Sequence, residues 1–109
     1  MVSKIVSDIL KKEYNYPNET GITIYDAINF LEKEHKLVVS AVKECGSDNK
    51  SEQWRCFVEV IPETKDAPNR IIFQDSWPLF FDYEEVLNNC LYFYFVDKGF
   101  IPLLGNIDN

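Results

Sequence analysis

One histidine and three cysteines are the residues of this 109-residue chain that could support nucleophilic chemistry. A cysteine nucleophile needs a base within hydrogen-bonding distance, and His35 is the one imidazole in the sequence. Nothing in the spacing brings His35 to Cys45, Cys56 or Cys90. Each cysteine stands among apolar residues, a setting typical of a small core side chain. We therefore predict no catalytic residue, and an enzyme that pairs His35 with a cysteine is the class with the least support.

The same residues show no pattern for a metal or a cofactor. The sequence contains no C-x-x-C, no H-E-x-x-H, no G-x-S-x-G and no glycine-rich phosphate loop. A zinc site built from His35 and the three cysteines would need four scattered elements to converge. We predict no metal and no cofactor. An odd number of unpaired cysteines, with no signal peptide and no apolar run long enough to span a membrane, predicts free thiols and a cytoplasmic location.

Carboxylates are the remaining candidates, and they gather in the last third of the chain. The net charge is −7, and residues 76–109 hold five acids against one lysine. Such a surface repels phosphate backbones and anionic membranes and attracts a basic protein at long range. The alternative is that the acidity only keeps a small protein soluble. We predict a protein partner, with no nucleic acid and no membrane, for a candidate acidic patch that comprises Asp82, Glu84, Glu85 and Asp97.

The element that must position these carboxylates is a helix over 82–99. Asp82 can cap the first turn while Glu85, three residues later, completes a capping box, and Gly99 supplies the left-handed residue that ends a helix. A buried strand over 91–96 is the alternative, but apolar residues keep helical spacing for three turns. That stripe comprises Tyr83, Val86, Leu87, Cys90, Leu91 and Tyr94.

Three apolar residues fall off this stripe: Phe93, Phe95 and Val96. We expect them to be covered by an N-terminal helix, by the segment 101–104, or by another chain. The third possibility predicts self-association as a homodimer.

The rest of the chain supplies two more helices and three strands. Helical spacing of Val2, Ile5, Val6, Ile9 and Leu10 predicts a first helix, and Thr23 caps a second helix that runs to about His35. Alternation and β-branched residues predict strands over 37–42, 54–61 and 70–74, with polar loops over 46–53 and 62–69. The segment 76–81 is expected to cross apolar surface before the last helix.

These elements predict an α+β fold in the order α-α-β-β-β-α. We expect a three-stranded antiparallel sheet with helices packed on one face. The whole chain, 1–109, is predicted to form a single domain: an N-terminal helix and loop over 1–21, an α-β-β-β-α core over 22–98, and a C-terminal tail over 99–109.

Residues 23–98 resemble double-stranded-RNA-binding domains in the order and length of their elements. Those domains place lysines at the start of the last helix and a glycine-proline-x-histidine element between the first two strands. This chain has Asp82, Glu84 and Glu85 at the first position, and neither proline nor histidine in 46–53. The resemblance therefore implies the architecture without the binding residues.

A second resemblance covers residues 22–98 and rests on short motifs. Phe-Leu-Glu-Lys-Glu-His-Lys at 30–36 and Phe-Asp-Tyr-Glu-Glu-Val-Leu at 81–87 are similar to segments of small uncharacterised proteins of gut bacteria and their phages. Those proteins show Trp-Leu-Arg-x-x-His and Tyr-Glu-Glu-Ala-Leu-Glu, where this chain has Phe30 for the tryptophan and Val86 for the alanine. The resemblance implies a phage or mobile-element context and transfers no site.

Together these observations predict a non-enzymatic interaction protein of phage or mobile-element origin. The alternative is an acidic inhibitor or immunity-type protein that covers a basic toxin or a nucleic-acid enzyme.

Overall fold

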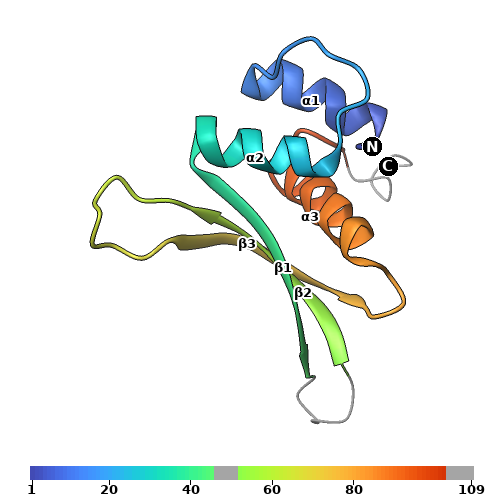
Figure 1. Ribbon diagram of the computed structural model, residues 1–109, viewed down its shortest axis with the longest axis vertical. Helices are drawn as coiled ribbons and strands as arrows, with labels where there is room; N and C mark the ends of the chain where they lie inside the picture. Colours follow the sequence, from blue (N-terminus) through green and yellow to red (C-terminus); the bar gives the residue numbers. More distant parts are fainter. Residues whose placement is uncertain (46–51, 103–109) are drawn as a thin grey trace.

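The computed structural model describes residues 1–45 and 52–102 and has the predicted α+β architecture (Figure 1). Three helices and three strands follow the order α-α-β-β-β-α, as the sequence predicts. The helices are α1 (Lys4–Tyr14), α2 (Ile24–His35) and α3 (Tyr83–Asp97), and the strands are β1 (Leu37–Cys45), β2 (Glu52–Val60) and β3 (Arg70–Pro78).

Local capping explains where each helix begins. Ser3, Thr23 and Asp82 have extended backbones, and each side chain accepts a hydrogen bond from the amide three residues later. Asp82 and Glu85 form the predicted capping box, and the segment 91–96 is helical. Gly99 has φ +83°, as expected for the residue that follows a helix.

The sheet is antiparallel in the order β1-β2-β3, with β2 in the centre. Ala41 lies opposite Cys56, which in turn lies opposite Asp75. All three strands differ from their predicted limits: β1 continues to Cys45, β2 starts at Glu52, and β3 continues to Pro78. Several polar residues that the sequence assigned to loops belong to strands because they pair with a neighbouring strand. Such pairing depends on the strand register rather than on residue propensity. The first part of the predicted loop over 46–53 lies outside the described residues.

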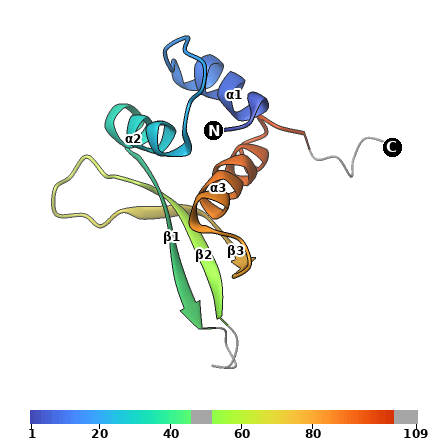
Figure 2. The same ribbon diagram turned by 45° about the vertical axis from the view of Figure 1, so that its right-hand side comes forward.

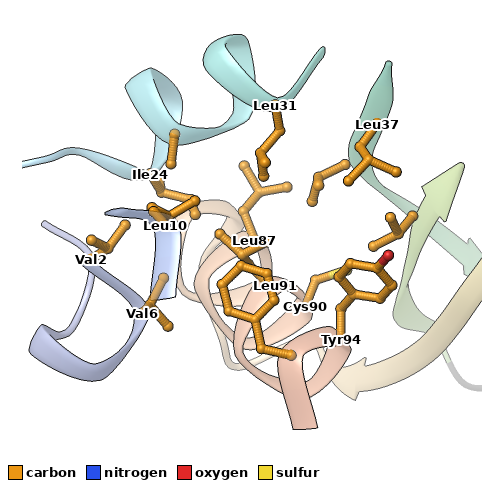
Figure 3. Close-up of a cluster of buried hydrophobic side chains, with 14 of the residues drawn as sticks. Val2, Val6, Leu10, Ile24, Leu31, Leu37, Leu87, Cys90, Leu91 and Tyr94 are labelled. Atoms are coloured by element: carbon orange, nitrogen blue, oxygen red, sulfur yellow. The ribbon is translucent and has the colours of Figure 1, made fainter. Parts of the chain in front are cut away.

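The helices lie together over one face of the sheet (Figures 1 and 2). α3 packs against all three strands and α2 packs against β1, whereas α1 contacts α2 and α3. Their apolar side chains meet in one core, shown in part in Figure 3. The opposite sheet face carries half-buried residues such as Val38 and Phe57, together with an ion pair between Arg55 and Glu44 at 3.1 Å.

The structure places α1 over the surplus aromatic residues of α3. Phe95 is fully buried, and its ring stacks on Tyr14 of α1 with centroids 5.6 Å apart. Phe100 adds a further ring at 6.0 Å from Phe95. The N-terminal helix thus supplies one of the expected kinds of cover, and Phe93 remains partly exposed. Ile101, from the expected segment 101–104, is also buried, and residues 103 and 104 lie outside the described residues.

Two residues of the predicted helical stripes are not core positions. Ile5 and Tyr83 fit the helical stripes by spacing, but both are exposed. Ile5 is 41% exposed near the start of α1, whereas Tyr14 at its end, which the predicted stripe omitted, is buried. Tyr83 lies in the first turn of α3, and its ring centroid is 5.7 Å from that of Trp54 on β2. The side chain nevertheless stays 43% exposed, so spacing alone could not decide its burial.

Candidate functional site

The most exposed apolar side chains of the described residues include several at the turn from β3 to α3, which lies far from α1 in Figure 1. Phe80 is 81% exposed. Its ring lies 4.7 Å from that of Phe81, and Trp77 contacts both Phe81 at 6.2 Å and Phe93 at 5.3 Å. We name this surface the corner patch and define it by six residues: Trp77, Leu79, Phe80, Phe81, Tyr83 and Phe93.

The expectation for segment 76–81 holds in part. Trp77 and Phe81 are partly buried and pack against the core, as a segment that crosses apolar surface should. Its first three residues belong to β3, however, and Phe80 is exposed. The signal was present in the sequence as a Trp-Pro-Leu-Phe-Phe run before a capping aspartate. Composition alone could not show whether the run was covered or exposed.

Two tryptophans that face each other across β2 and β3 hold the patch in place. Trp54 lies opposite Trp77 in the sheet register. The indole N–H of Trp54 donates a hydrogen bond of 2.9 Å to the carbonyl oxygen of Phe81 and so fixes the turn to the sheet. The indole N–H of Trp77 is buried without an oxygen or nitrogen acceptor among the described residues.

The predicted acidic patch divides between the two ends of α3. Asp82, Glu84 and Glu85 are exposed in or next to the first turn, beside the corner patch. Asp97 is the last residue of the same helix, about 22 Å away at 1.5 Å per residue. Asp82 and Glu85 each accept a backbone hydrogen bond in the capping box, at 2.8 and 2.9 Å, so their carboxylates are held in fixed positions.

The structure adds one carboxylate that sequence reasoning missed. Asp75 is exposed on β3, on the sheet face that carries the helices, because it lies opposite the buried Cys56. Strand alternation could have placed it there if the predicted strand had extended beyond Gln74. Asp75, Asp82 and Glu84 are thus three exposed carboxylates on the segments that carry the corner patch.

His35 has a structural setting at the end of α2. Its Nε2 lies 2.7 Å from the carbonyl oxygen of Tyr14, and its ring packs against Tyr14 and Phe30 at 5.0 and 5.5 Å. Cys45 lies at the far end of β1, about 27 Å along the chain from the strand's start. In the described part of the chain, the contacts of His35 are thus with α1 and α2.

The cysteines occupy two different environments. Cys56 and Cys90 are fully buried between β2 and α3. A hydrogen bond between the two thiols lowers the pKa of Cys56 and raises the pKa of Cys90, and burial adds to the rise at Cys90. Cys45 is exposed at the end of β1, so the expectation that all three are core residues is wrong for this one.

Two buried tyrosines also have raised pKa values. Burial raises the pKa of Tyr14, and a hydrogen bond with Tyr94 adds to this effect. Burial likewise raises the pKa of Tyr94. Both rings lie in the core, and their position indicates packing rather than chemistry.

Within residues 1–45 and 52–102, no three His, Cys, Asp or Glu side chains come together in a way that could hold a metal ion. Among the helices of the same residues, none has the length and apolar character needed to cross a bilayer. No family model, curated protein or solved structure matches this chain.

Proposed function

We propose that the protein is a non-enzymatic interaction protein that binds a basic protein partner through the corner patch. The observation that carries this proposal is the exposed aromatic cluster around Phe80, next to the acidic first turn of α3. Contiguous apolar patches with polar rims mark protein interfaces, and aromatic side chains are enriched at their centres.

The patch is well ordered for binding. The Trp77 ring contacts both Phe81 and Phe93, and the hydrogen bond from Trp54 to the Phe81 carbonyl holds the turn. Rings that are already positioned lose little side-chain entropy when a partner docks, which favours affinity.

The charge around the corner patch indicates the sign of the charge that a partner should carry. The stretch from Asp75 to Asp97 contains five acids and no lysine or arginine. A neighbouring cation does exist on β1, where the ammonium of Lys43 lies 5.1 Å from the centre of the Trp54 ring. Apart from this edge, the rim attracts a basic partner and repels a second copy of the same patch.

A more specific candidate is an inhibitor or immunity-type protein that covers a basic toxin or nucleic-acid enzyme. Its support is the position of Asp82, Glu84 and Glu85 at the exposed start of α3. Such a surface can occupy a basic site that otherwise meets phosphates. This function predicts an association rate that falls steeply as salt increases, and a salt-independent rate would count against it.

The test is affinity capture from a lysate of the source organism with four proteins: the wild type, two variants of the patch and one control variant. The first variant, Phe80→Ala, removes an exposed ring. The second, Asp82→Asn with Glu84→Gln and Glu85→Gln, removes three charges but keeps side-chain acceptors for the capping box. The control, Glu13→Gln with Glu19→Gln and Glu34→Gln, removes three exposed charges on or near α1 and α2.

We expect both patch variants to lose a basic protein that the wild type and the control retain at low salt. Capture of the same proteins by all four would contradict the proposal. Sedimentation of the purified wild type measures self-association, and a dimer that Phe80→Ala dissociates would show that a second copy, and not a basic partner, occupies the patch.

A further inference from the structure

Two of the three cysteines lie in one layer of the core, between the sheet and α3. Cys56 is on the side of β2 that faces the helices, since the residues at alternate positions, Trp54 and Val58, are buried as well. Cys90 lies on the buried stripe of α3, one turn before Tyr94 (Figure 3). Both cysteines are fully buried.

Ring contacts on both sides of this pair show how α3 lies along β2. At one end, the ring of Tyr83 lies 5.7 Å from that of Trp54, which stands two positions before Cys56. At the other end, the ring of Tyr94 lies 5.9 Å from that of Phe73, whose partner in β2 stands two positions after Cys56. The cysteine of α3 lies between these two tyrosines along the helix. The contacts therefore place the two cysteines opposite each other.

The Cys56 sulfur is surrounded by hydrogen-bond donors. The Cys90 thiol is the strongest influence, and together with the Trp77 side chain and the backbone N–H of Asp75 it outweighs burial and lowers the pKa of Cys56. The Trp77 indole N–H is itself buried without an oxygen or nitrogen acceptor among the described residues. Because such donors stabilise a thiolate, Cys56 is the better nucleophile of the two, and Cys90 keeps its proton.

We propose that Cys56 and Cys90 form a redox-active dithiol, which a hydroperoxide such as hydrogen peroxide converts to a disulfide between β2 and α3. The Cys56 thiolate attacks one oxygen of the peroxide, the O–O bond breaks, and hydroxide leaves and is protonated to water. The Cys90 sulfur then attacks the sulfenic acid of Cys56, the S–O bond breaks, and the Cys90 proton leaves with the hydroxyl group as a second water. The two thiols lose two electrons and two protons in total, and the peroxide gains them.

The pair lies close beneath the surface. Asp75, which pairs with Cys56 across the sheet, is exposed, and its carboxylate acts on the charge of both sulfur atoms. A peroxide is small enough to reach this depth when the β3 side opens locally. The inference goes beyond the proposed function and does not depend on it, because neither thiol belongs to the corner patch.

The test uses the full chain with Cys45→Ser, so that the exposed thiol cannot link two molecules. The protein is treated with hydrogen peroxide under conditions that oxidise glutathione, and free thiols are then blocked with N-ethylmaleimide in denaturant. Trypsin cleaves after Lys65 and Arg70 and so separates the two remaining cysteines. Mass spectrometry identifies blocked, oxidised and linked peptides.

We expect one pair of peptides joined through Cys56 and Cys90, a protein mass lower by two hydrogen atoms, and reversal of both by dithiothreitol. Blocked thiols at both positions after the peroxide treatment would overturn the proposal. Sulfinic acid at either position without a linked pair would overturn it as well.

Two further variants assign the roles of the thiols, and circular dichroism checks that each is folded. In Cys90→Ala the sulfenic acid of Cys56 has no partner, so dimedone should label it, whereas in Cys56→Ala the remaining thiol should stay unlabelled. Labelling of Cys90 but not Cys56 would overturn the assignment of the nucleophile. If either variant fails to fold, brief dimedone labelling of the Cys45→Ser protein during oxidation answers the same question.

The contribution of the indole is measured by the rate at which the linked pair forms. Trp77→Phe should slow this rate about threefold to tenfold, because the Cys56 thiolate loses one donor. Trp54→Phe is the matched control, since its indole N–H donates to the Phe81 carbonyl instead, and it should not slow the reaction. An unchanged rate for Trp77→Phe would overturn the assignment of this indole as a donor to Cys56.

Discussion

Two clusters of aromatic rings, both attached to α3, differ in whether another helix covers them. The inner cluster joins Tyr14, Phe95 and Phe100, with ring centroids 5.6 to 6.2 Å apart. The corner patch joins Trp77, Phe81 and Phe93 at similar separations, 5.3 to 6.2 Å. Phe95 is fully buried, whereas Phe93 is 37% exposed and Phe80 is 81% exposed.

Contacts between aromatic rings are therefore not sufficient to form a core. α1 closes over the inner cluster, and no described element plays the same part at the corner. The inner rings should therefore account for stability, and the corner rings are left available for binding.

The largest expected difference between the two clusters is in stability, when one ring of each is truncated to alanine. Phe95→Ala should lower the free energy of unfolding by about 3–5 kcal/mol, because it leaves a cavity in the fully buried core. Phe80→Ala should change it by about 0.5 kcal/mol or less, since the ring is mostly in solvent. Urea denaturation followed by circular dichroism measures both. A large loss for Phe80→Ala would mean that the corner is part of the core.

A smaller effect should appear at alkaline pH, and it comes from two buried tyrosines, Tyr14 of the inner cluster and Tyr94 next to it. Burial raises the pKa of Tyr14 and Tyr94 above the ordinary value of 10.0. Below that value both tyrosines are neutral whether the chain is folded or unfolded. Above it the unfolded chain releases protons first, so the free energy of unfolding falls as pH rises.

Tyr14→Phe should make this fall shallower, because the variant removes one of the groups whose pKa is raised in the folded chain. Tyr25→Phe, which changes an exposed tyrosine of α2, is the matched control. Urea midpoints measured as a function of pH compare the three proteins. An equally steep fall in Tyr14→Phe would remove the ionisation of this residue as the cause.

The smallest expected effect distinguishes the two tryptophans that support the corner. Trp54→Phe should cost about 1 kcal/mol more than Trp77→Phe. The Trp54 indole donates a hydrogen bond to the Phe81 carbonyl, whereas the Trp77 indole has no oxygen or nitrogen acceptor among the described residues. Urea denaturation compares the two variants, and hydrogen exchange at Phe80 and Phe81 shows whether the turn loosens. Equal costs would mean that this bond does not hold the corner patch.

The candidate site was only partly accessible from sequence. Asp82, Glu84 and Glu85 were identified with their positions in the first turn, because capping is a local property of a few neighbouring residues. Asp97 belonged to the same charged stretch in sequence, but the length of α3 separates it from the other three. Asp75 and Phe80 were missed, since their exposure depends on where the helix layer ends over the sheet.

By itself, the sequence determined the α-α-β-β-β-α order, the capped starts of the second and third helices and the buried stripe of α3 from Val86 to Tyr94. These features arise from hydrogen bonds and side-chain periodicity over a few residues, which a linear pattern records. The tertiary structure decided that α1 covers Phe95 and leaves Phe80 exposed, and that β3 extends to Pro78. Cover and strand pairing join segments far apart in the chain, so spacing along the sequence does not contain them.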